Sequence, residues 1–289
     1  MVSKNVKLAN HAGFCYGVKR AVDLSVKIKE DNPSTPVYIL GQLIHNTQVI
    51  EYLSSIGIHT IETIPEKLNG ICIIRTHGVT PQTIQELEQK ECQIIDATCP
   101  DVKRVQNKAR SLAEEGYKVI IIGKPDHPEV IAIKAHADLC SENEAIVISS
   151  EEEVEKYLST IKKSKKIGIV IQTTQTHGNF KKILPIIAEY STELKVYNTI
   201  CSATFKRQQE AMTLAKEVEL MIIVGSKSSA NTTHLAEIVS QIKKTIHIET
   251  EKELDTYKDL INITSKIGIT AGASTPGFII DQVIERIGE

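Results

Sequence analysis

The chain has 289 residues, of which 41% are hydrophobic and 24% charged, which favours a sizeable folded core over wholesale disorder. Its 34 Lys and Arg residues against 36 Asp and Glu give a net charge of −2, which argues against a protein that mainly coats nucleic acid or an anionic membrane. No apolar run approaches the roughly 20 residues that span a bilayer, and residues 1–8 hold no secretory signal, so we expect a soluble, cytoplasmic protein without nucleic-acid or membrane partners.

Short runs rich in Ile and Val alternate with amphipathic stretches along the whole chain. The predicted strands are residues 37–40, 71–74, 93–95, 119–122, 145–148, 167–171, 220–224, 245–248 and 266–270. The predicted helices include residues 18–30, 81–90, 102–115, 205–217, 233–243 and 277–287. Short, uniformly apolar strands separated by helices are typical of parallel sheets that are covered on both faces. The sequence therefore predicts an α/β fold with mostly parallel sheets.

One pattern of residues occurs three times. Cys15-Tyr-Gly-Val-Lys-Arg resembles Cys99-Pro-Asp-Val-Lys-Arg, and Cys201 begins a similar run with one extra residue. Each cysteine precedes a predicted helix, and the strand that follows ends in a glycine 24 or 26 residues after the cysteine: Gly41, Gly123 and Gly225. A further strand in each part then leads into a small polar loop. Such a repeat predicts three similar units.

The repeat places the predicted boundaries just before the second and third cysteines. We predict a first α/β unit over residues 1–97 that includes an N-terminal strand, a second over 98–199, and a third with a C-terminal segment over 200–289. In a pseudo-threefold arrangement, the carboxyl ends of the strands, where α/β proteins bind ligands, would converge on a centre. The alternative is three ordinary α/β units that share only a strand–Gly–helix pattern.

Six cysteines in a chain without a signal peptide are expected to stay reduced, so the important ones are candidates for metal ligation or catalysis. Cys15, Cys99 and Cys201 each precede a predicted helix, whose dipole favours a thiolate. They are 84 and 102 residues apart, unlike the close pairs of a structural zinc site or a ferredoxin. Three ligands would leave a four-iron cluster with one open iron. The other cysteines, Cys72, Cys92 and Cys140, are expected to be structural.

Polar loops follow several of the predicted strands and open into helices, which suits a phosphate-bearing ligand. The loops that we expect at the centre contain His45, His77, His127, Thr173, Ser229, Asn231 and Ser274. Glu129 follows His127 and Pro128 in the first turn of a predicted helix. From the residues alone it is either a surface carboxylate that satisfies the helix dipole or a proton donor near the cluster.

Taken together, the motifs resemble one known family over nearly the whole chain. They are Gly13-Phe-Cys15-Tyr-Gly-Val, Leu40-Gly-Gln-Leu-Ile-His45-Asn, Arg75-Thr-His77-Gly-Val, Asp96-Ala-Thr-Cys99-Pro, His127-Pro-Glu129-Val, Gln172-Thr173-Thr, Thr199-Ile-Cys201, Gly225-Ser-Lys and Thr270-Ala-Gly-Ala-Ser274. In this order they are similar to the 4-hydroxy-3-methylbut-2-enyl diphosphate reductases, which have three α/β units around a central iron–sulfur cluster. The resemblance thus implies the same fold as the repeat.

The resemblance also implies roles for individual residues. The metal ligands would be Cys15, Cys99 and Cys201, and Glu129 would be the catalytic proton donor. The substrate would contact the histidines and small polar residues of the loops: His45, His77, His127, Thr173, Ser229, Asn231 and Ser274. One departure is Ala230, where the family commonly has a second serine, so one hydroxyl contact to the diphosphate is either absent or supplied by Thr232.

The implied activity is the reductive dehydroxylation of (E)-4-hydroxy-3-methylbut-2-enyl diphosphate to isopentenyl and dimethylallyl diphosphate, the last step of non-mevalonate isoprenoid synthesis. It implies one 4Fe-4S cluster per chain and, since no nicotinamide-binding fingerprint is evident, an external ferredoxin- or flavodoxin-type electron donor. Two other classes stay open on the residues alone: a non-catalytic iron–sulfur or zinc protein, and a phosphate-binding protein with inert cysteines. The first needs no Glu129, and the second is colourless even without oxygen.

Overall fold

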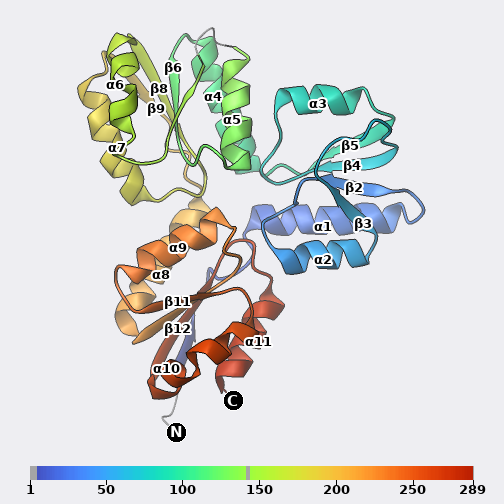
Figure 1. Cartoon of the computed structure of the whole chain (residues 1–289), viewed down its shortest axis with the longest axis vertical. Coiled ribbons are helices and arrows are strands. Elements are labelled where there is room, and N and C mark those ends of the chain that lie inside the picture. The colour runs from blue at the N-terminus through green and yellow to red at the C-terminus, as the bar shows by residue number, and fades with distance from the viewer. Residues whose placement is uncertain (1–4, 141–143, 289) are drawn as a thin grey trace. The chain divides into compact units, whose positions relative to one another are not determined.

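The computed structural model describes residues 5–140 and 144–288, which form helices and three four-stranded sheets with only parallel strand pairs (Figure 1). The predicted α/β fold with parallel sheets is confirmed. The chain divides into two compact bodies. Body 1 contains residues 5–20, 44–52 and 202–288, and body 2 contains residues 21–43 and the described residues from 53 to 201.

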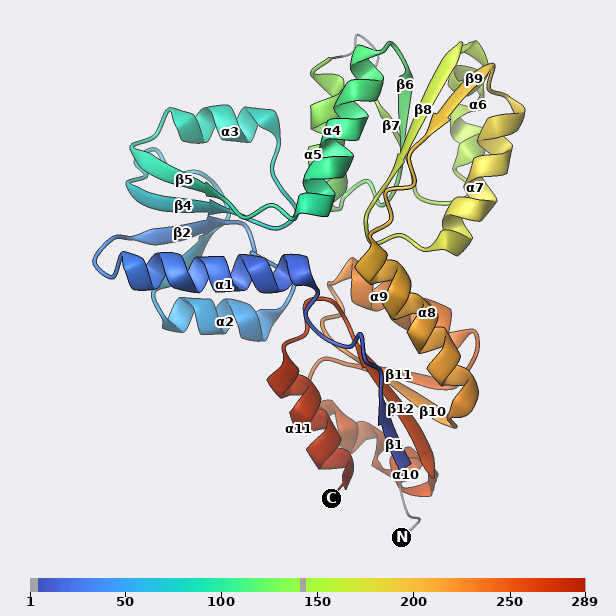
Figure 2. The same cartoon turned by 180° about the vertical axis from the view of Figure 1, so that it is seen from behind.

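Body 2 contains two of the sheets. The first has the order β3-β2-β4-β5, with β2 (Val37–Leu40), β3 (Ile58–Ile61), β4 (Gly70–Ile74) and β5 (Cys92–Asp96). Its helices are α1 (Tyr16–Asp31), which begins in body 1, α2 (Thr47–Ser55), which ends in body 2, and α3 (Pro81–Glu88). Figures 1 and 2 both show α3 on one side of this sheet and α1 on the other.

The second sheet of body 2 has the order β7-β6-β8-β9, with β6 (Lys118–Ile122), β7 (Ile146–Ile148), β8 (Lys166–Ile171) and β9 (Glu193–Val196). Helices α4 (Pro100–Glu114) and α5 (Pro128–Asp138) cover one face, and α6 (Val154–Lys163) and α7 (His177–Glu189) cover the other. Because both faces are covered, the central strands are buried aliphatic runs, as the sequence predicts.

Body 1 contains the third sheet, in the order β1-β12-β10-β11. Its strands are β1 (Asn5–Leu8), β10 (Leu220–Val224), β11 (Thr245–Ile248) and β12 (Lys266–Ala271). One face packs on α8 (Ser202–Glu217) and α9 (Ala230–Ser240). The other packs on α10 (Lys258–Ile263), α11 (Gly277–Gly288) and the short 3-10 helix η1 (Glu251–Tyr257), as Figure 2 shows.

The three sheets share one strand order. The strand after each cysteine helix is β2, β6 or β10, and it lies between the next two strands of its sheet. The fourth position is filled by β5, by β9 and, in the third sheet, by β1 from the N-terminus. The N-terminal strand was predicted to belong to the unit of residues 1–97, but its Asn5 pairs with Lys266 of β12. A local sequence pattern cannot specify so distant a partner. Where the boundaries between the three units fall stays a prediction.

Within the described residues, no helix has the length and apolar character needed to cross a membrane.

Candidate functional site

The three cysteines of the repeat are held by equivalent backbone hydrogen bonds. The N–H groups of Cys15, Cys99 and Cys201 donate to the carbonyl oxygens of Ala273, Thr76 and Thr173, with N···O distances of 3.1, 3.0 and 3.0 Å. Each acceptor is the second residue after a corresponding strand: β12, β4 or β8. The helices α1, α4 and α8 begin directly after the cysteines. The repeat therefore sets each thiol between a helix start and a strand-end loop.

These three thiols differ from the buried cysteine of β4. Cys15, Cys99 and Cys201 are half-buried and form no disulfide within the described residues. Cys72 is fully buried, and this burial, with a smaller effect of Cys92, raises the pKa of its thiol to about 11. A thiol of that pKa stays protonated at neutral pH and makes a poor metal ligand. This contrast agrees with the expected structural role of Cys72.

The sequence did not reveal that an aspartate contacts Cys201. Asp101, in the first turn of α4, is 6% exposed, and its Oδ2 accepts a hydrogen bond from Cys201 Sγ at 3.0 Å. Its Oδ1 pairs with the Arg104 guanidinium at 2.6 Å. The sequence shows only that Asp101 comes two residues after Cys99. An acidic residue is common there, because it interacts favourably with the helix dipole. Its contact with a cysteine 100 residues away depends on the fold.

Glu129 is a buried carboxylate rather than a surface one. It lies in the first turn of α5 and is 1% exposed. The Thr173 N–H donates to Oε1 at 2.7 Å, and the Thr173 hydroxyl donates to Oε2 at 2.9 Å. Burial raises the pKa of the Glu129 carboxyl to about 7; the two Thr173 hydrogen bonds oppose the rise, and the charge of Asp101 adds to it. Glu129 can therefore hold or release a proton near neutral pH.

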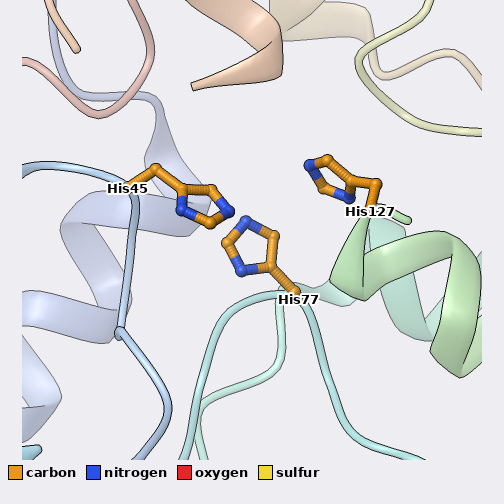
Figure 3. A group of neighbouring side chains, drawn as sticks. All are labelled: His45, His77 and His127. Atoms are coloured by element: carbon orange, nitrogen blue, oxygen red, sulfur yellow. The ribbon is translucent and has the colours of Figure 1, made fainter. Parts of the chain in front are cut away.

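Two histidines of body 2 lie beside this carboxylate's helix. His127 is the N-cap of α5, and its Nδ1 accepts a hydrogen bond from the Glu129 N–H at 3.1 Å. Because Nδ1 accepts, a neutral His127 ring carries its proton on Nε2. The His77 ring lies edge-on to it, with the centroids 5.3 Å apart and the planes at 84° (Figure 3). Both imidazoles come from loops at the carboxyl ends of strands, β6 and β4.

Body 1 gathers a second group of predicted residues, all small or polar. The Ser274 hydroxyl donates to the His45 carbonyl oxygen at 3.1 Å, and its Oγ lies 3.4 Å from Ser229 Oγ. Ser229 is the N-cap residue of α9, yet its side chain makes no capping hydrogen bond. Asn46, beside His45, caps α2 by accepting from the Val49 N–H at 3.0 Å. The group thus offers hydroxyls at a helix N-terminus, which suits an anion.

Asn231 adds an amide donor to this group. It is 5% exposed, its Oδ1 lies 3.5 Å from the Thr204 hydroxyl, and its buried Nδ2 has no hydrogen-bond partner among the described residues. A buried donor without a partner is costly unless a ligand completes it. Thr232 is fully buried and packs against Gly225 and Gly272. Its role in place of the missing serine at Ala230 stays a prediction.

Each body therefore holds part of the predicted residue set. Body 2 contains one group: Cys99, Cys201, His77, His127, Glu129 and Thr173. Body 1 contains the other: Cys15, His45, Ser229, Asn231 and Ser274. The chemistry divides in the same way, since the buried carboxyl group of Glu129 is in body 2 and the serine hydroxyls and the asparagine amide are in body 1.

Comparison with known proteins identifies the family of this chain. The sequence model of the LytB protein family matches residues 6–288. The chain belongs to the LytB family. A relative from Geobacter metallireducens, 4-hydroxy-3-methylbut-2-enyl diphosphate reductase, is 42% identical over 98% of this chain and 96% of its own length. A relative of the same name from Clostridium tetani is 46% identical over 98% of this chain, which spans 43% of that longer protein.

The fold of this LytB chain also matches a solved structure. The structure of (E)-4-hydroxy-3-methyl-but-2-enyl diphosphate reductase, described as the terminal enzyme of the non-mevalonate pathway, is 40% identical to it. The match has a TM-score of 0.72 and covers 100% of this chain and 99% of the other. The family resemblance that the motifs predict is therefore confirmed.

Proposed function

We propose that this LytB chain reduces (E)-4-hydroxy-3-methylbut-2-enyl diphosphate to isopentenyl and dimethylallyl diphosphate. Membership of the family and the full-length similarity to reductases of that name support the activity. The observation that carries the residue assignment is the position of Thr173. Its carbonyl oxygen accepts from the Cys201 N–H, while its own N–H and hydroxyl donate to Glu129. One residue thus joins a proposed metal ligand to the proposed proton donor.

The chain's thiols fit a 4Fe-4S cluster with three protein ligands. Cys15, Cys99 and Cys201 are half-buried and each directly precedes a helix, whose N-terminus favours a thiolate. We assign them as the ligands. When bound, the cluster would supply an open iron as a Lewis acid and a path for single electrons. Two electrons must come from outside, and we assign their supply to a ferredoxin- or flavodoxin-type donor.

The diphosphate is assigned to the polar group of body 1. The Ser229 hydroxyl, the N-terminus of α9 and the Asn231 Nδ2, which has no hydrogen-bond partner among the described residues, can donate to an anion, and Ser274 lies beside Ser229. His45 belongs to the same group through its hydrogen bond with Ser274. Holding the non-reacting phosphates orients the allylic end of the substrate, and this binding energy contributes to the reaction rate.

The residues of body 2 are assigned to proton transfer. Glu129 supplies the proton with which the substrate hydroxyl leaves as water, and Thr173 keeps its carboxyl group in place. His127 holds the Glu129 backbone, and its Nε2–H, like the neighbouring His77 ring, is a donor group for the substrate. A carboxyl with a pKa of about 7 is protonated often enough to act as an acid at neutral pH.

The decisive experiment is turnover by oxygen-free protein. Reconstituted protein is mixed with a chemically reduced viologen and the allylic alcohol diphosphate, and the products are separated and identified. We expect both isopentenyl and dimethylallyl diphosphate. A brown protein that converts no substrate would instead fit an electron carrier, and a colourless, iron-free protein would fit a phosphate-binding protein. Either result would reject the proposal.

A further inference from the structure

Two side chains of α8 hold the loop that leads into Cys15. Glu210 accepts four hydrogen bonds from this loop: the Asn10 N–H and Nδ2 reach Oε1 at 2.7 and 2.8 Å, and the His11 N–H and Nδ1 reach Oε2 at 2.8 and 2.7 Å. Arg207 donates from Nε to the His11 carbonyl oxygen at 2.9 Å and from a terminal nitrogen to the Gly13 carbonyl oxygen at 2.7 Å. Six hydrogen bonds from one helix thus fix residues 10–13.

An arginine is unusual at the buried position that Arg207 occupies. It is the sixth residue after Cys201, and the sixth residues after Cys15 and Cys99 are Ala21 and Val105, both fully buried. Arg207 is itself only 3% exposed. Burying a guanidinium costs more free energy than burying an alkyl group unless its N–H groups are satisfied. Its hydrogen bonds to the carbonyl oxygens of the Cys15 loop offset part of this cost.

The repeat explains why the two Lys-Arg pairs differ in burial. In α4 both Lys103 and Arg104 are exposed, whereas in α8 Lys206 is exposed and Arg207 is buried. Arg104 comes five residues after Cys99, and its side chain is 64% exposed. Arg207 comes one residue later relative to its own cysteine, and one residue turns a side chain by about 100° around an α-helix. The extra residue before this pair therefore directs the second arginine into the core of body 1.

The loop is also fixed on its other side. Gly13 has a φ of +87°, and a Cβ there would lie 3.2 Å from the Thr275 carbonyl oxygen and 3.1 Å from Ile280 Cδ1. Two residues later the Cys15 N–H donates to Ala273. The backbone before Cys15 thus lies between α8 and the loop after β12. With both contacts intact, the path from Asn10 to Cys15 has little freedom to move.

We propose that Arg207 and Glu210 are positioning residues for Cys15: they hold its loop so that the thiol is already in place for a metal. The proposal rests on the assignment of Cys15 as a cluster ligand. In this proposal α8, which follows Cys201, also fixes the loop that leads into Cys15. Neither residue touches the substrate in this account. Their effect passes through the backbone of residues 10–13.

The test is the reactivity of Cys15 in metal-free protein. Apo-protein is treated with iodoacetamide, and the alkylation rates of Cys15 and Cys99 are measured separately by peptide mass spectrometry. Arg207→Met is expected to change the Cys15 rate at least ~5-fold relative to wild type while the Cys99 rate stays constant. Arg207→Lys, which keeps one charged donor, should restore part of the difference. Lys206→Met, at the exposed neighbouring position, is the matched control and should change neither rate.

A second variant keeps the test valid if Arg207→Met does not fold. Glu210→Gln keeps the size of the side chain but replaces one acceptor oxygen by an amide donor, so it should change the Cys15 rate in the same sense by a smaller factor. In reconstituted protein, both variants should lose iron to a chelator several-fold faster than wild type. Cys15 rates in both variants equal to that of Lys206→Met would overturn the positioning role. Because the alkylation assay needs no cluster, that failure is distinct from a wild type that binds no iron.

Discussion

The loops after β6 and β10 share a backbone plan but carry different chemistry. Four residues after Gly123 and Gly225 stand the N-cap residues His127 and Ser229. Six residues after the same glycines stand Glu129 and Asn231, each in the first turn of the following helix. The repeat thus provides one scaffold position twice, once for a carboxyl group and once for an amide.

Glu129 and Asn231 differ in whether the protein satisfies the hydrogen-bonding groups of their side chains. Both Glu129 oxygens accept hydrogen bonds from Thr173, so the protein itself fixes the carboxyl group. The Asn231 Nδ2 is buried without a partner among the described residues, so it has a donor to offer a ligand. In the proposed function, Glu129 holds a proton and Asn231 binds an anion. The following variants test this division through kcat and KM.

The largest effect is expected from Glu129→Gln. The amide cannot donate a carboxyl proton, so kcat should fall by ~100-fold or more, while iron content and KM stay close to wild type. Steady-state turnover with a reduced viologen, together with iron analysis, measures both. Glu155→Gln is the matched control, since Glu155 is an exposed acid in the first turn of α6. Near-normal turnover in Glu129→Gln would reject its role as proton donor.

Asn231→Ala should affect mainly substrate binding. Loss of an amide donor to a charged phosphate is worth about 1.5–3 kcal/mol, or roughly 10–100-fold in KM, with a smaller change in kcat. The same kinetic assay separates the two constants. Asn262→Ala, at an exposed position of α10, should leave both unchanged. A fall in kcat at constant KM would contradict the proposed division.

The pH dependence of kcat/KM should show a descending limb near pH 7. A proton donor acts in its protonated form, and the pKa of Glu129 is raised to about 7, so activity should be full below this pH and fall about tenfold per unit above it. Rates from pH 6 to 9 measure the limb. In Glu129→Gln the residual activity should lack it. An identical limb in both proteins would assign the titration to another group.

The smallest effect is expected from Thr173→Val, which removes the hydroxyl bond to Oε2 and keeps the backbone N–H bond to Oε1. The hydroxyl stabilises the carboxylate, so its loss should move the pH limb to higher pH and lower kcat several-fold. Thr213→Val, at an exposed position of α8, serves as the control. A limb that moves to lower pH would show that the hydroxyl does not donate to Glu129.

Sequence patterns predicted all the central strands of the three sheets and several of the edge strands. The predicted bounds 37–40, 220–224 and 245–248 match β2, β10 and β11. Two edge strands were missed, β3 (Ile58-His-Thr-Ile) and β9 (Glu193-Leu-Lys-Val), because a half-exposed strand gives a weaker apolar signal. The edge strands β5, β7 and β11 were nevertheless predicted. Helix and strand identity therefore followed from local hydrophobicity wherever the element was fully buried.

The site was predictable in its members but not in its contacts. The repeated cysteines and the polar loops follow from sequence, because each unit places them at the same point relative to a strand. The choice between a surface and a buried Glu129 needed the fold, since its partner Thr173 is 44 residues away. The contact of Asp101 with Cys201 and the burial of Arg207 also depend on tertiary packing.

The most direct measurement is the iron content and visible absorbance of reconstituted, oxygen-free cysteine variants. Cys15→Ser, Cys99→Ser and Cys201→Ser should each lose most of the iron and the brown colour, because each removes one of only three proposed ligands. Cys72→Ser, in the buried β4, should retain both. A normal iron content and spectrum in all three ligand variants would contradict the account at its centre.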